Sequence, residues 1–455
     1  MVRLRRIAVS LALVLMPSAL WAQDQGLSNI LLSFFTPQRP FELKFTGHQA
    51  HFSSATEARA TLNLLNRNIA YQLGSFPLGS SSGGFTFTLD PSLGVLNRSA
   101  ESFGPLFAER AVTAGKGKFT AGANYLHATW DQFEGNDLGN GDLVLTLTHA
   151  DTDNSHDTLT PAFEGDVIDV KLGMNLTTDT FVTFMTYGLT DRLDVGIAVP
   201  FQRVKMDATL HTTVVNIATQ NTVTLFHQFD PAKDTGCGGN RITNNNLEND
   251  YCANGDASGI GDIVVRAKLG LVRGDHSSLA GGIDARLPTG KEEDLLGTGA
   301  YQIKPYLIAS FLPKGRFSPH FNVGYTFTGD SELLGGKLPD EFGWTVGFDS
   351  APVSRLTITG DVVGRLLIDA ERLAVRDKTF FYRNAPDPLP PFRREFTRPE
   401  FFAEKGNMSL ILGSIGFKYN PVGRLLMSAN VLFPLTPDNG LQDNLTPVFA
   451  IDYNF

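Results

Sequence analysis

Residues 79–83 (GSSSG) have the G-x-S-x-G spacing that places Ser81 where a hydrolase carries its nucleophile. In such an enzyme the serine sits on a sharp turn between a strand and a helix, which exposes its hydroxyl group. Here the motif lies in a Ser/Gly-rich stretch that indicates neither element. We expect a loop at this position and predict no catalytic residue.

A second group of reactive side chains lies in residues 149–157 (HADTDNSHD), where aspartates at alternate positions resemble the start of a calcium-binding loop. Such a loop needs glycine at its sixth position and a closing glutamate at its twelfth. His156 and Ala162 stand at those positions. The stretch therefore favours a solvated loop, and we predict no metal site and no cofactor.

Met1 to Ala22 has the pattern of a secretory signal peptide. Arg3, Arg5 and Arg6 form a basic start, an apolar run follows, and Ala22 is a small residue before the expected cleavage point. The alternative is a membrane-anchoring helix, but the run is shorter than the ~20 apolar residues that a span needs. We expect residues 1–22 to be removed when the chain leaves the cytosol.

Cys237 and Cys252 are the only 2 cysteines of the chain and lie in a polar, Gly/Asn-rich stretch. In the oxidising compartment that a signal peptide implies, such a pair is expected to form a disulfide. Closing a loop of about 15 residues stabilises a fold by about 3 kcal/mol in the chain-entropy model. A zinc site is the alternative, but no His/Cys set has ligand spacing.

Composition excludes several classes of protein. The chain has 455 residues with a formal net charge of -9, so it offers no basic surface for nucleic acid. Its 34 phenylalanines argue against disorder, which is poor in aromatic residues. The length suffices for a large core or for a large surface in contact with a membrane.

Apolar and polar residues alternate with a period of two through most of the chain after residue 115. In the last strand, for example, Phe449, Ile451, Tyr453 and Phe455 share one face. No apolar run after residue 22 approaches the length of a membrane-spanning helix. Each one-sided strand needs either lipid or a core, and the pattern indicates no helical layer over these strands. We therefore expect the apolar faces to meet lipid.

Tight turns and long polar connections alternate between these strands, as in outer-membrane barrels. The turns lie at 190–192, 273–276, 314–316, 351–354 and 421–423, and the long connections at 134–164, 215–258, 288–299, 329–340, 370–406 and 434–443. We predict an all-β fold: a transmembrane antiparallel up-and-down barrel over residues 116–455, in the bacterial outer membrane. The first and last strands must pair, because an open sheet edge is costly in hydrocarbon.

The alternation predicts about twelve strands, an even number as in bacterial barrels. Both chain ends then fall on the side of the tight turns, which is the periplasmic side. The expected strands are 116–133, 165–188, 192–214, 259–272, 277–287, 300–313, 316–328, 341–350, 354–368, 407–420, 423–433 and 444–455.

Charged residues on the polar strand faces are expected to point into the barrel lumen. On the lipid face, Arg or Lys would cost about 2–4 kcal/mol each at the bilayer midplane. The charges are of mixed sign, which predicts no strong ion selectivity. They either form a structural ion-pair network or line a path for a small solute. The set comprises Asp194, Asp262, Arg266, Lys268, Asp284, Arg286, Lys304, Asp361 and Arg365.

Residues 23–115 do not alternate. Residues 58–71 have apolar residues near helical spacing, at Leu62, Leu65 and Ile69. A twelve-stranded barrel is wider than a filled eight-stranded one, so its lumen has room for other chain segments. We expect residues 23–115 to enter the barrel as a plug; the alternative is a periplasmic tail or small domain.

Three stretches and the chain end resemble the MetA-pathway-of-phenol-degradation family of outer-membrane proteins. The stretches are 187–200 (YGLTDRLDVGIAVP), 259–266 (GIGDIVVR) and 286–299 (RLPTGKEEDLLGTG), and the chain end is 446–455. The resemblance implies a barrel fold. It also implies transport of small, often aromatic compounds across the outer membrane, the role ascribed to members of this family. It implies no defined substrate and no binding residues for this chain.

These observations favour passive uptake of small solutes, including aromatic or apolar ones, through the outer membrane. The partners expected are outer-membrane lipid or lipopolysaccharide and a small-molecule solute, with no nucleic acid. One alternative is a structural protein that displays its long loops without transport. A minor alternative is a lipid hydrolase on the outer barrel wall, for which His127 on the first strand is the candidate residue.

Overall fold

The structure is a computed structural model. It describes residues 26–35, 43, 55–80, 84, 87–90, 95–98, 102–148, 166–216, 227–231, 237, 242–243, 245–311, 316–331, 336–384, 392–436 and 438–455. The expected signal peptide, the calcium-like stretch and residues 81–83 lie outside the described residues.

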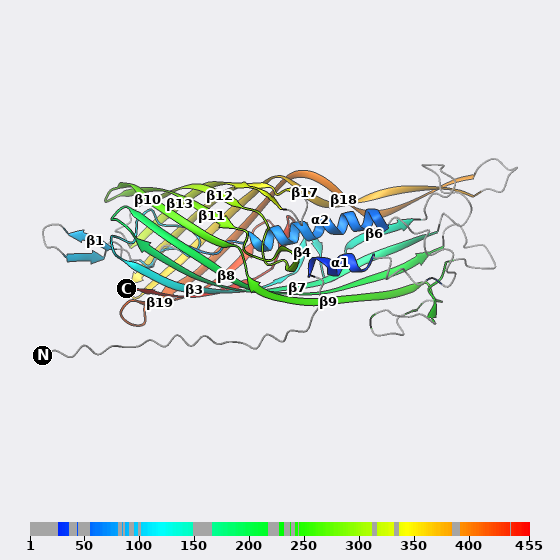
Figure 1. The fold of residues 1–455 in the computed structure, drawn as a ribbon, viewed down its shortest axis with the longest axis horizontal. Coiled ribbons are helices and arrows are strands. Elements are labelled where there is room, and N and C mark those ends of the chain that lie inside the picture. The colour runs from blue at the N-terminus through cyan, green and yellow to red at the C-terminus, as the bar shows by residue number, and fades with distance from the viewer. Residues whose placement is uncertain are drawn as a thin grey trace.

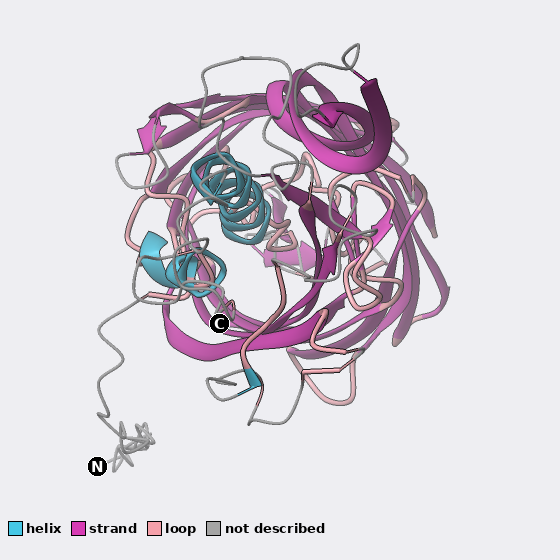
Figure 2. Ribbon diagram, turned by 90° about the vertical axis from the view of Figure 1, so that its right-hand side faces the viewer, coloured by secondary structure: helices cyan, strands magenta, loops and turns pink. Residues whose placement is uncertain are grey.

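The described part of the chain forms a closed antiparallel barrel of twelve strands, as the alternation predicts (Figures 1 and 2). The wall strand that begins as β9 is interrupted and continues as β10. The strands are β3 (Phe119–Trp130), β7 (Val167–Gly188), β8 (Leu193–Val215), β9 (Glu248–Ile260) with β10 (Ile263–Arg273), β11 (Ser277–Leu287), β12 (Gln302–Phe311), β13 (Phe317–Thr328), β16 (Asp340–Val353), β17 (Leu356–Asn384), β18 (Phe392–Tyr419), β19 (Leu425–Pro434) and β21 (Thr446–Asn454).

The ring closes between the last strand and the first. β21 pairs with β3 in the register Val448↔Leu126, and β3 pairs in turn with β7. The β7–β8 pairing completes the circle. Closure leaves no edge strand in the wall, which is the condition for a sheet to cross hydrocarbon.

Smaller elements join the wall strands or lie beside them. Helix α1 covers Ser28–Ser33 and helix α2 covers Ala55–Gly74, which contains the helix expected over 58–71. The short pieces are β1 (Phe87–Asp90), β2 (Val95–Arg98), β4 (Gln132–Phe133), β5 (Asn136–Asp137), β6 (Leu143–Thr148), η3 (Glu292–Asp294), β14 (Asp330–Ser331), β15 (Gly336–Lys337) and β20 (Leu441–Gln442). None of the helices described is long and apolar enough to cross a membrane.

The two ends of the barrel differ. We call the end with the tight turns and Phe455 the short-turn end, and the end where β17 and β18 project furthest the long-loop end (Figure 1). In outer-membrane barrels the former faces the periplasm and the latter the cell exterior. Phe119, Tyr453 and Phe455 cluster at the short-turn end. The ring centroid of Phe455 lies 5.3 Å from that of Phe119 and 4.7 Å from that of Tyr453. Such an aromatic girdle marks a membrane interface.

The outer surface of the short-turn half is apolar. Phe201, Leu307 and Phe449 are each about half exposed, at 50%, 50% and 52%. Similar side chains surround this half on every wall strand: Tyr125, Phe181, Ile197, Ile260, Val265, Ile283, Ile303, Phe321, Val346, Ile358, Ile415, Met427 and Ile451. Apolar exposure on this scale requires hydrocarbon around it. The chain is therefore a transmembrane barrel of the outer membrane.

The apolar face changes sides in the long-loop half. On β7 the buried apolar residues at Leu172, Met174 and Leu176 point inward, whereas Phe181 and Met185 point outward nearer the short-turn end. β8 changes in the same way, between outward Phe201 and inward Val204. Since outward positions beyond the change carry charges such as Arg203 and Lys205, this half stands in water.

The prediction that no helical layer covers these strands was wrong. α1 and α2 lie inside the ring (Figure 2) and pack against the inward apolar residues of the long-loop half. Leu31 of α1 and Ile69 of α2 are fully buried there, in one core with Leu172 and Met206. The barrel thus uses lipid as the apolar partner in one half and its own N-terminal helices in the other.

Several connections expected as loops are strands. β17 and β18 continue as a paired hairpin through most of the expected loop 370–406, with Phe380 and Phe396 directly opposite. β9 occupies part of the expected loop 215–258, and β6 adds to β7 within 134–164. The predicted disulfide is confirmed: Cys237 and Cys252 are joined in the long-loop half.

The face change predicts where a charge is tolerated. Leu307→Arg, on the lipid face near the middle of β12, is expected to cost about 2–4 kcal/mol of unfolding free energy in liposomes. Asn254→Arg on β9 points outward in the long-loop half and should cost less than about 0.5 kcal/mol. Urea unfolding followed by tryptophan fluorescence measures both. Equal losses would contradict the assigned membrane boundary.

Candidate functional site

Residues 102–114 run along the inner face of the barrel wall in the short-turn half; we call this segment the inner belt. Its backbone groups are paired with side chains that point inward from successive strands. Phe103 N donates to Thr357 Oγ1 on β17, Glu109 N to Asn322 Oδ1 on β13, and Ala114 N to Asp194 Oδ2 on β8, at 3.0, 2.7 and 2.9 Å. The wall thus supplies the hydrogen bonds that a strand partner would otherwise give.

Asp361 makes the densest of these contacts. Its carboxylate accepts from the backbone N–H groups of Leu106, Phe107 and Ala108 at 3.2, 3.2 and 3.1 Å. Asp361 is buried on β17, where a carboxylate would be costly without such donors. Asp361 was predicted to line a solute path, and in the structure its carboxylate binds the inner belt.

Lys268 and Asp194 also bind the inner belt. Lys268 Nζ donates to the carbonyl oxygens of Arg110 and Val112, both at 3.3 Å, and lies 3.8 Å from Asp194. Both side chains are buried. Asp262, the second of the two residues between β9 and β10, instead holds the 288–299 connection by accepting from Gly290 N at 3.1 Å and Thr298 N at 2.8 Å.

A Ser-His-Asp chain of hydrogen bonds lies behind the inner belt. Ser310 Oγ is 2.8 Å from His320 Nδ1, and His320 Nε2 is 2.5 Å from Asp349 Oδ2. The three side chains are at most 2% exposed, and Ser310 Oγ also accepts from Ala111 N at 2.9 Å. A nucleophile needs access to substrate, so this arrangement is a clasp for the inner belt.

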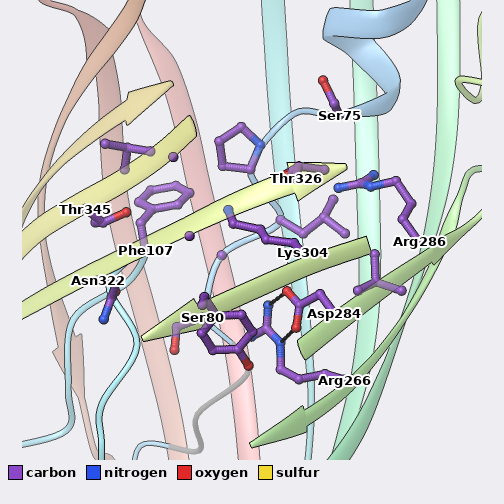
Figure 3. A pocket seen from close by; sticks show the side chains of 18 of the residues that line it. Ser75, Ser80, Phe107, Arg266, Asp284, Arg286, Lys304, Asn322, Thr326 and Thr345 are labelled. Atoms are coloured by element: carbon purple, nitrogen blue, oxygen red, sulfur yellow. Dashed lines mark hydrogen bonds and ion pairs between the residues drawn. The ribbon is translucent and has the colours of Figure 1, made fainter. Parts of the chain in front are cut away.

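A cavity of about 190 Å³ lies between the end of α2 and the inner belt (Figure 3). Ser75 borders it next to the end of α2, whereas Phe107 and Ser80 border it on the belt side, where Ser80 N donates to Leu106 O at 2.7 Å. Apolar lining comes from Pro77, Leu78, Val182, Phe184, Ala198, Val264, Tyr306 and Val363, and polar lining from Arg266, Asp284, Arg286, Gln302, Lys304, Asn322, Thr326, Glu341, Thr345 and Arg365.

Two of the cavity's cations are held in ion pairs. The Asp284 carboxylate accepts hydrogen bonds from Arg266 Nε at 2.7 Å and from Arg266 Nη2 at 2.6 Å. Glu109 of the inner belt forms a further ion pair with Arg266 Nη1. Arg365 donates to Glu341 Oε2 at 3.0 and 2.6 Å and to Ser75 Oγ at 2.7 Å. The Arg266–Asp284 pair is bidentate, with one guanidinium N–H group to each carboxylate oxygen, whereas Arg365 directs two N–H groups to the single oxygen Glu341 Oε2.

The other two cations have no carboxylate partner among the residues described. Arg286 Nη1 donates to the carbonyl oxygen of Gly74, the last residue of α2, where a cation offsets the helix dipole. Lys304 Nζ has neither an ion pair nor a hydrogen bond within the described part of the chain. It extends past Gly324 and Gly343, and a Cβ atom at Gly343 would lie 3.2 Å from it.

α2 is held against the wall by side chains along its length. Asn68 Nδ2 donates to Glu371 O at 2.8 Å, and Gln72 Oε1 accepts from Leu441 N at 2.7 Å. Burial, together with the nearby Glu341 charge, raises the pKa of the Tyr71 phenol. The phenol therefore stays protonated and donates to Pro339 O at 3.2 Å.

The nine charged residues predicted to face the lumen divide into two groups. Arg266, Asp284, Arg286, Lys304 and Arg365 surround the cavity, whereas Asp194, Asp262, Lys268 and Asp361 bind chain segments elsewhere in the barrel. Sequence reasoning missed Glu109 and Phe107, because no strand pattern marks the inner belt. It could have found Glu341, which shares a face with Asp349 on a predicted strand.

His127 points outward, as predicted, with an exposed side chain. Its Nδ1 is 2.8 Å from Asp179 Oδ1, which also accepts from Tyr125 O–H at 2.6 Å. No serine takes part in these bonds among the described residues. Within that part of the chain, no group of three or more His, Cys, Asp and Glu side chains is placed to hold a metal ion.

The sequence matches the family model described as "Putative MetA-pathway of phenol degradation" over residues 150–340. The resemblance predicted from the motifs at 187–200, 259–266 and 286–299 is thereby confirmed. The motif at 446–455 lies outside the matched range. A comparison with curated protein sequences gives no match.

The fold is similar to several solved outer-membrane proteins. An outer membrane channel from Pseudomonas putida F1 has 11% identity and a TM-score of 0.43, covering 76% of this chain and 98% of that one. A FadL homologue from Pseudomonas aeruginosa has 11% identity and a TM-score of 0.32, covering 82% and 96%. The CymD monoaromatic hydrocarbon channel has 11% identity and a TM-score of 0.26, covering 75% and 88%.

Removing the Asp361 carboxylate should loosen the inner belt. Asp361→Ala leaves buried N–H groups at 106–108 without an acceptor, at a cost of about 1–3 kcal/mol. Amide exchange at these residues should accelerate about 5- to 150-fold. Asp377→Ala, exposed on the distal part of β17, should leave the rates unchanged. Unaltered exchange in Asp361→Ala would show that other contacts hold the inner belt.

Proposed function

We propose that the protein is an outer-membrane channel for passive uptake of small solutes, including aromatic or apolar ones. The observation that carries the proposal is the cavity between α2 and the inner belt, inside a barrel that crosses the membrane. A barrel with a purely structural role needs no hollow lined by both apolar and charged side chains. The family match over residues 150–340 supports the same function.

The lining of the cavity supports a mixed solute chemistry. Phe107, Tyr306 and Leu78 offer apolar surface, and Arg266 and Arg365 add charged groups to the same lining. Binding sites for small organic molecules commonly combine a mostly apolar lining with a few placed polar groups. Arg266, Asp284, Arg286, Lys304 and Arg365 are thus proposed to line the solute path.

In this proposal residues 23–115 act as a plug. The core around α1 and α2 fills the long-loop half, and the inner belt crosses the short-turn half, so the cavity lies between two constrictions. Passage then requires one or both to shift. Asp194, Lys268 and Asp361 would hold the inner belt in the closed position, and Asp262 would hold the 288–299 connection.

We also propose that the outer surface next to the face change contacts lipopolysaccharide. Arg203 and Asp256 form an exposed ion pair there, with 3.4 Å between Nη2 and Oδ2. Lys205, His127 and Asp179 share the same outward surface. Charges of both signs immediately outside the apolar zone suit phosphate and sugar groups of the outer leaflet.

Conductance tests the channel and the plug together. Ala111 N donates to Ser310 Oγ at 2.9 Å, so paired Ala111→Cys and Ser310→Cys substitutions would join the inner belt to β12 by a disulfide. In planar bilayers the unmodified protein should conduct small ions. The oxidised double variant should lose most of that conductance and regain it on reduction.

The single variants and the unmodified protein under reductant are the controls, because reduction also opens Cys237–Cys252. An oxidised double variant that conducts like the unmodified protein would contradict movement of the inner belt. A well-folded barrel with no conductance and no solute uptake in liposomes would contradict transport. That outcome would favour the alternative of a structural, loop-displaying protein.

A further inference from the structure

The cavity carries an excess of positive charge. Four cationic side chains surround it, and three carboxylates reach them: Asp284 and Glu341 in the lining and Glu109 from the inner belt. Asp284 forms an ion pair with Arg266, and Glu341 forms one with Arg365. One further negative charge in the cavity would therefore balance its described side chains.

The unbalanced charge centres on Lys304. Asp284 stands directly opposite Lys304 in the β11–β12 register, and Glu341 lies on β16 nearby. Neither the Asp284 carboxylate nor the Glu341 carboxylate is within ion-pair distance of Lys304 Nζ. Arg286 faces the same hollow with only a carbonyl oxygen as its described partner. Figure 3 shows Lys304 and Arg286 extending into the cavity that Phe107 borders.

An ammonium group in a confined site is unfavourable without a counter-charge or full hydration. A neutral hydrocarbon that filled the cavity would remove water from the Lys304 ammonium group without supplying a hydrogen bond or a counter-charge. A solute carrying a carboxylate would instead form charge-assisted hydrogen bonds with Lys304 and Arg286. The hydroxyl group of Tyr306, which has no hydrogen-bond partner among the residues described, lies in the same lining.

Size limits the rest of the solute. The cavity is about 190 Å³, and a cavity of about 150 Å³ is known to hold benzene in another protein. One aromatic ring with a small substituent therefore fits. Phe107, Tyr306 and Val182 supply apolar surface for such a ring.

We propose that this cavity binds small monoaromatic carboxylates, with Lys304 and Arg286 receiving the carboxylate group. The inference rests on the proposed channel function, since it names the class of solute that the channel holds between its two constrictions. It extends that function to anions, which the mixed charges of the lumen did not predict from sequence.

Binding to the full chain in detergent tests the proposal with three probes. Benzoate has the ring and the charge, benzyl alcohol has the ring alone, and acetate has the charge alone. Titration calorimetry should show benzoate binding at least about tenfold more tightly than either of the others. Equal binding of benzyl alcohol, or absence of benzoate binding, would overturn the proposal without any variant.

Lys304→Met should weaken benzoate binding by about tenfold or more, whereas Lys304→Arg should retain most of it. Lys205→Met removes the same charge from the outer surface and should change nothing. Heat-modifiable migration on a gel confirms that each variant is folded. Unchanged benzoate binding in folded Lys304→Met would refute the assignment.

Failure of this inference is distinguishable from failure of the channel function. Liposomes that take up benzyl alcohol through a protein with no benzoate binding would leave the channel standing and remove the anion site. Benzoate binding that depends on Lys304 would support the site even in a protein that passes no solute.

Discussion

The cost of an unpaired peptide group in hydrocarbon governs this structure. Neither water nor lipid can satisfy backbone N–H and C=O groups at the bilayer core, so a sheet that crosses it must close on itself. The β21–β3 pairing meets that demand, because it joins the last strand to the first. The same demand explains the inner belt, whose backbone N–H groups lie inside the ring and donate hydrogen bonds to Asp361, Asn322 and Asp194.

The change of apolar face along β7 and β8 divides the barrel into two physical regimes. In the short-turn half, side chains such as Phe201 face outward and are stabilised by lipid. In the long-loop half, Leu172 and Met206 face inward and are stabilised by α1 and α2. The N-terminal helices are therefore part of the core of the barrel. The cavity lies where the regimes meet, since neither the helices nor the inner belt fill that level.

Much of the wall could be predicted from sequence, because apolar residues at every second position of a strand indicate which face contacts an apolar medium. The strand order, the inward placement of Arg266 and Asp361 and the disulfide all follow from local patterns. What could not be predicted was the identity of that medium. Met174 and Phe181 belong to the same strand and are both apolar. Met174 packs in the core that contains α2, whereas Phe181 faces lipid.

The pairing of lumen charges was also beyond sequence analysis. Asp284 and Asp361 both stood as candidate lumen residues, but one forms an ion pair with Arg266 and the other binds backbone N–H groups of the inner belt. That distinction depends on residues 102–114, which have no strand periodicity to place them. Lys304 is distinguished from Lys268 in the same way, by the absence of a described partner rather than by its position on the strand.

Spin labels on β7 in liposomes test the central claim most directly. A label at Thr183 should be reached by oxygen dissolved in the lipid, and a label at Lys171, on the same outward face, by a water-soluble nickel chelate. A label at Phe184 should be shielded from the lipid. If the chelate reached Thr183 and Lys171 equally, the short-turn half would not lie in hydrocarbon and the membrane barrel described here would be wrong.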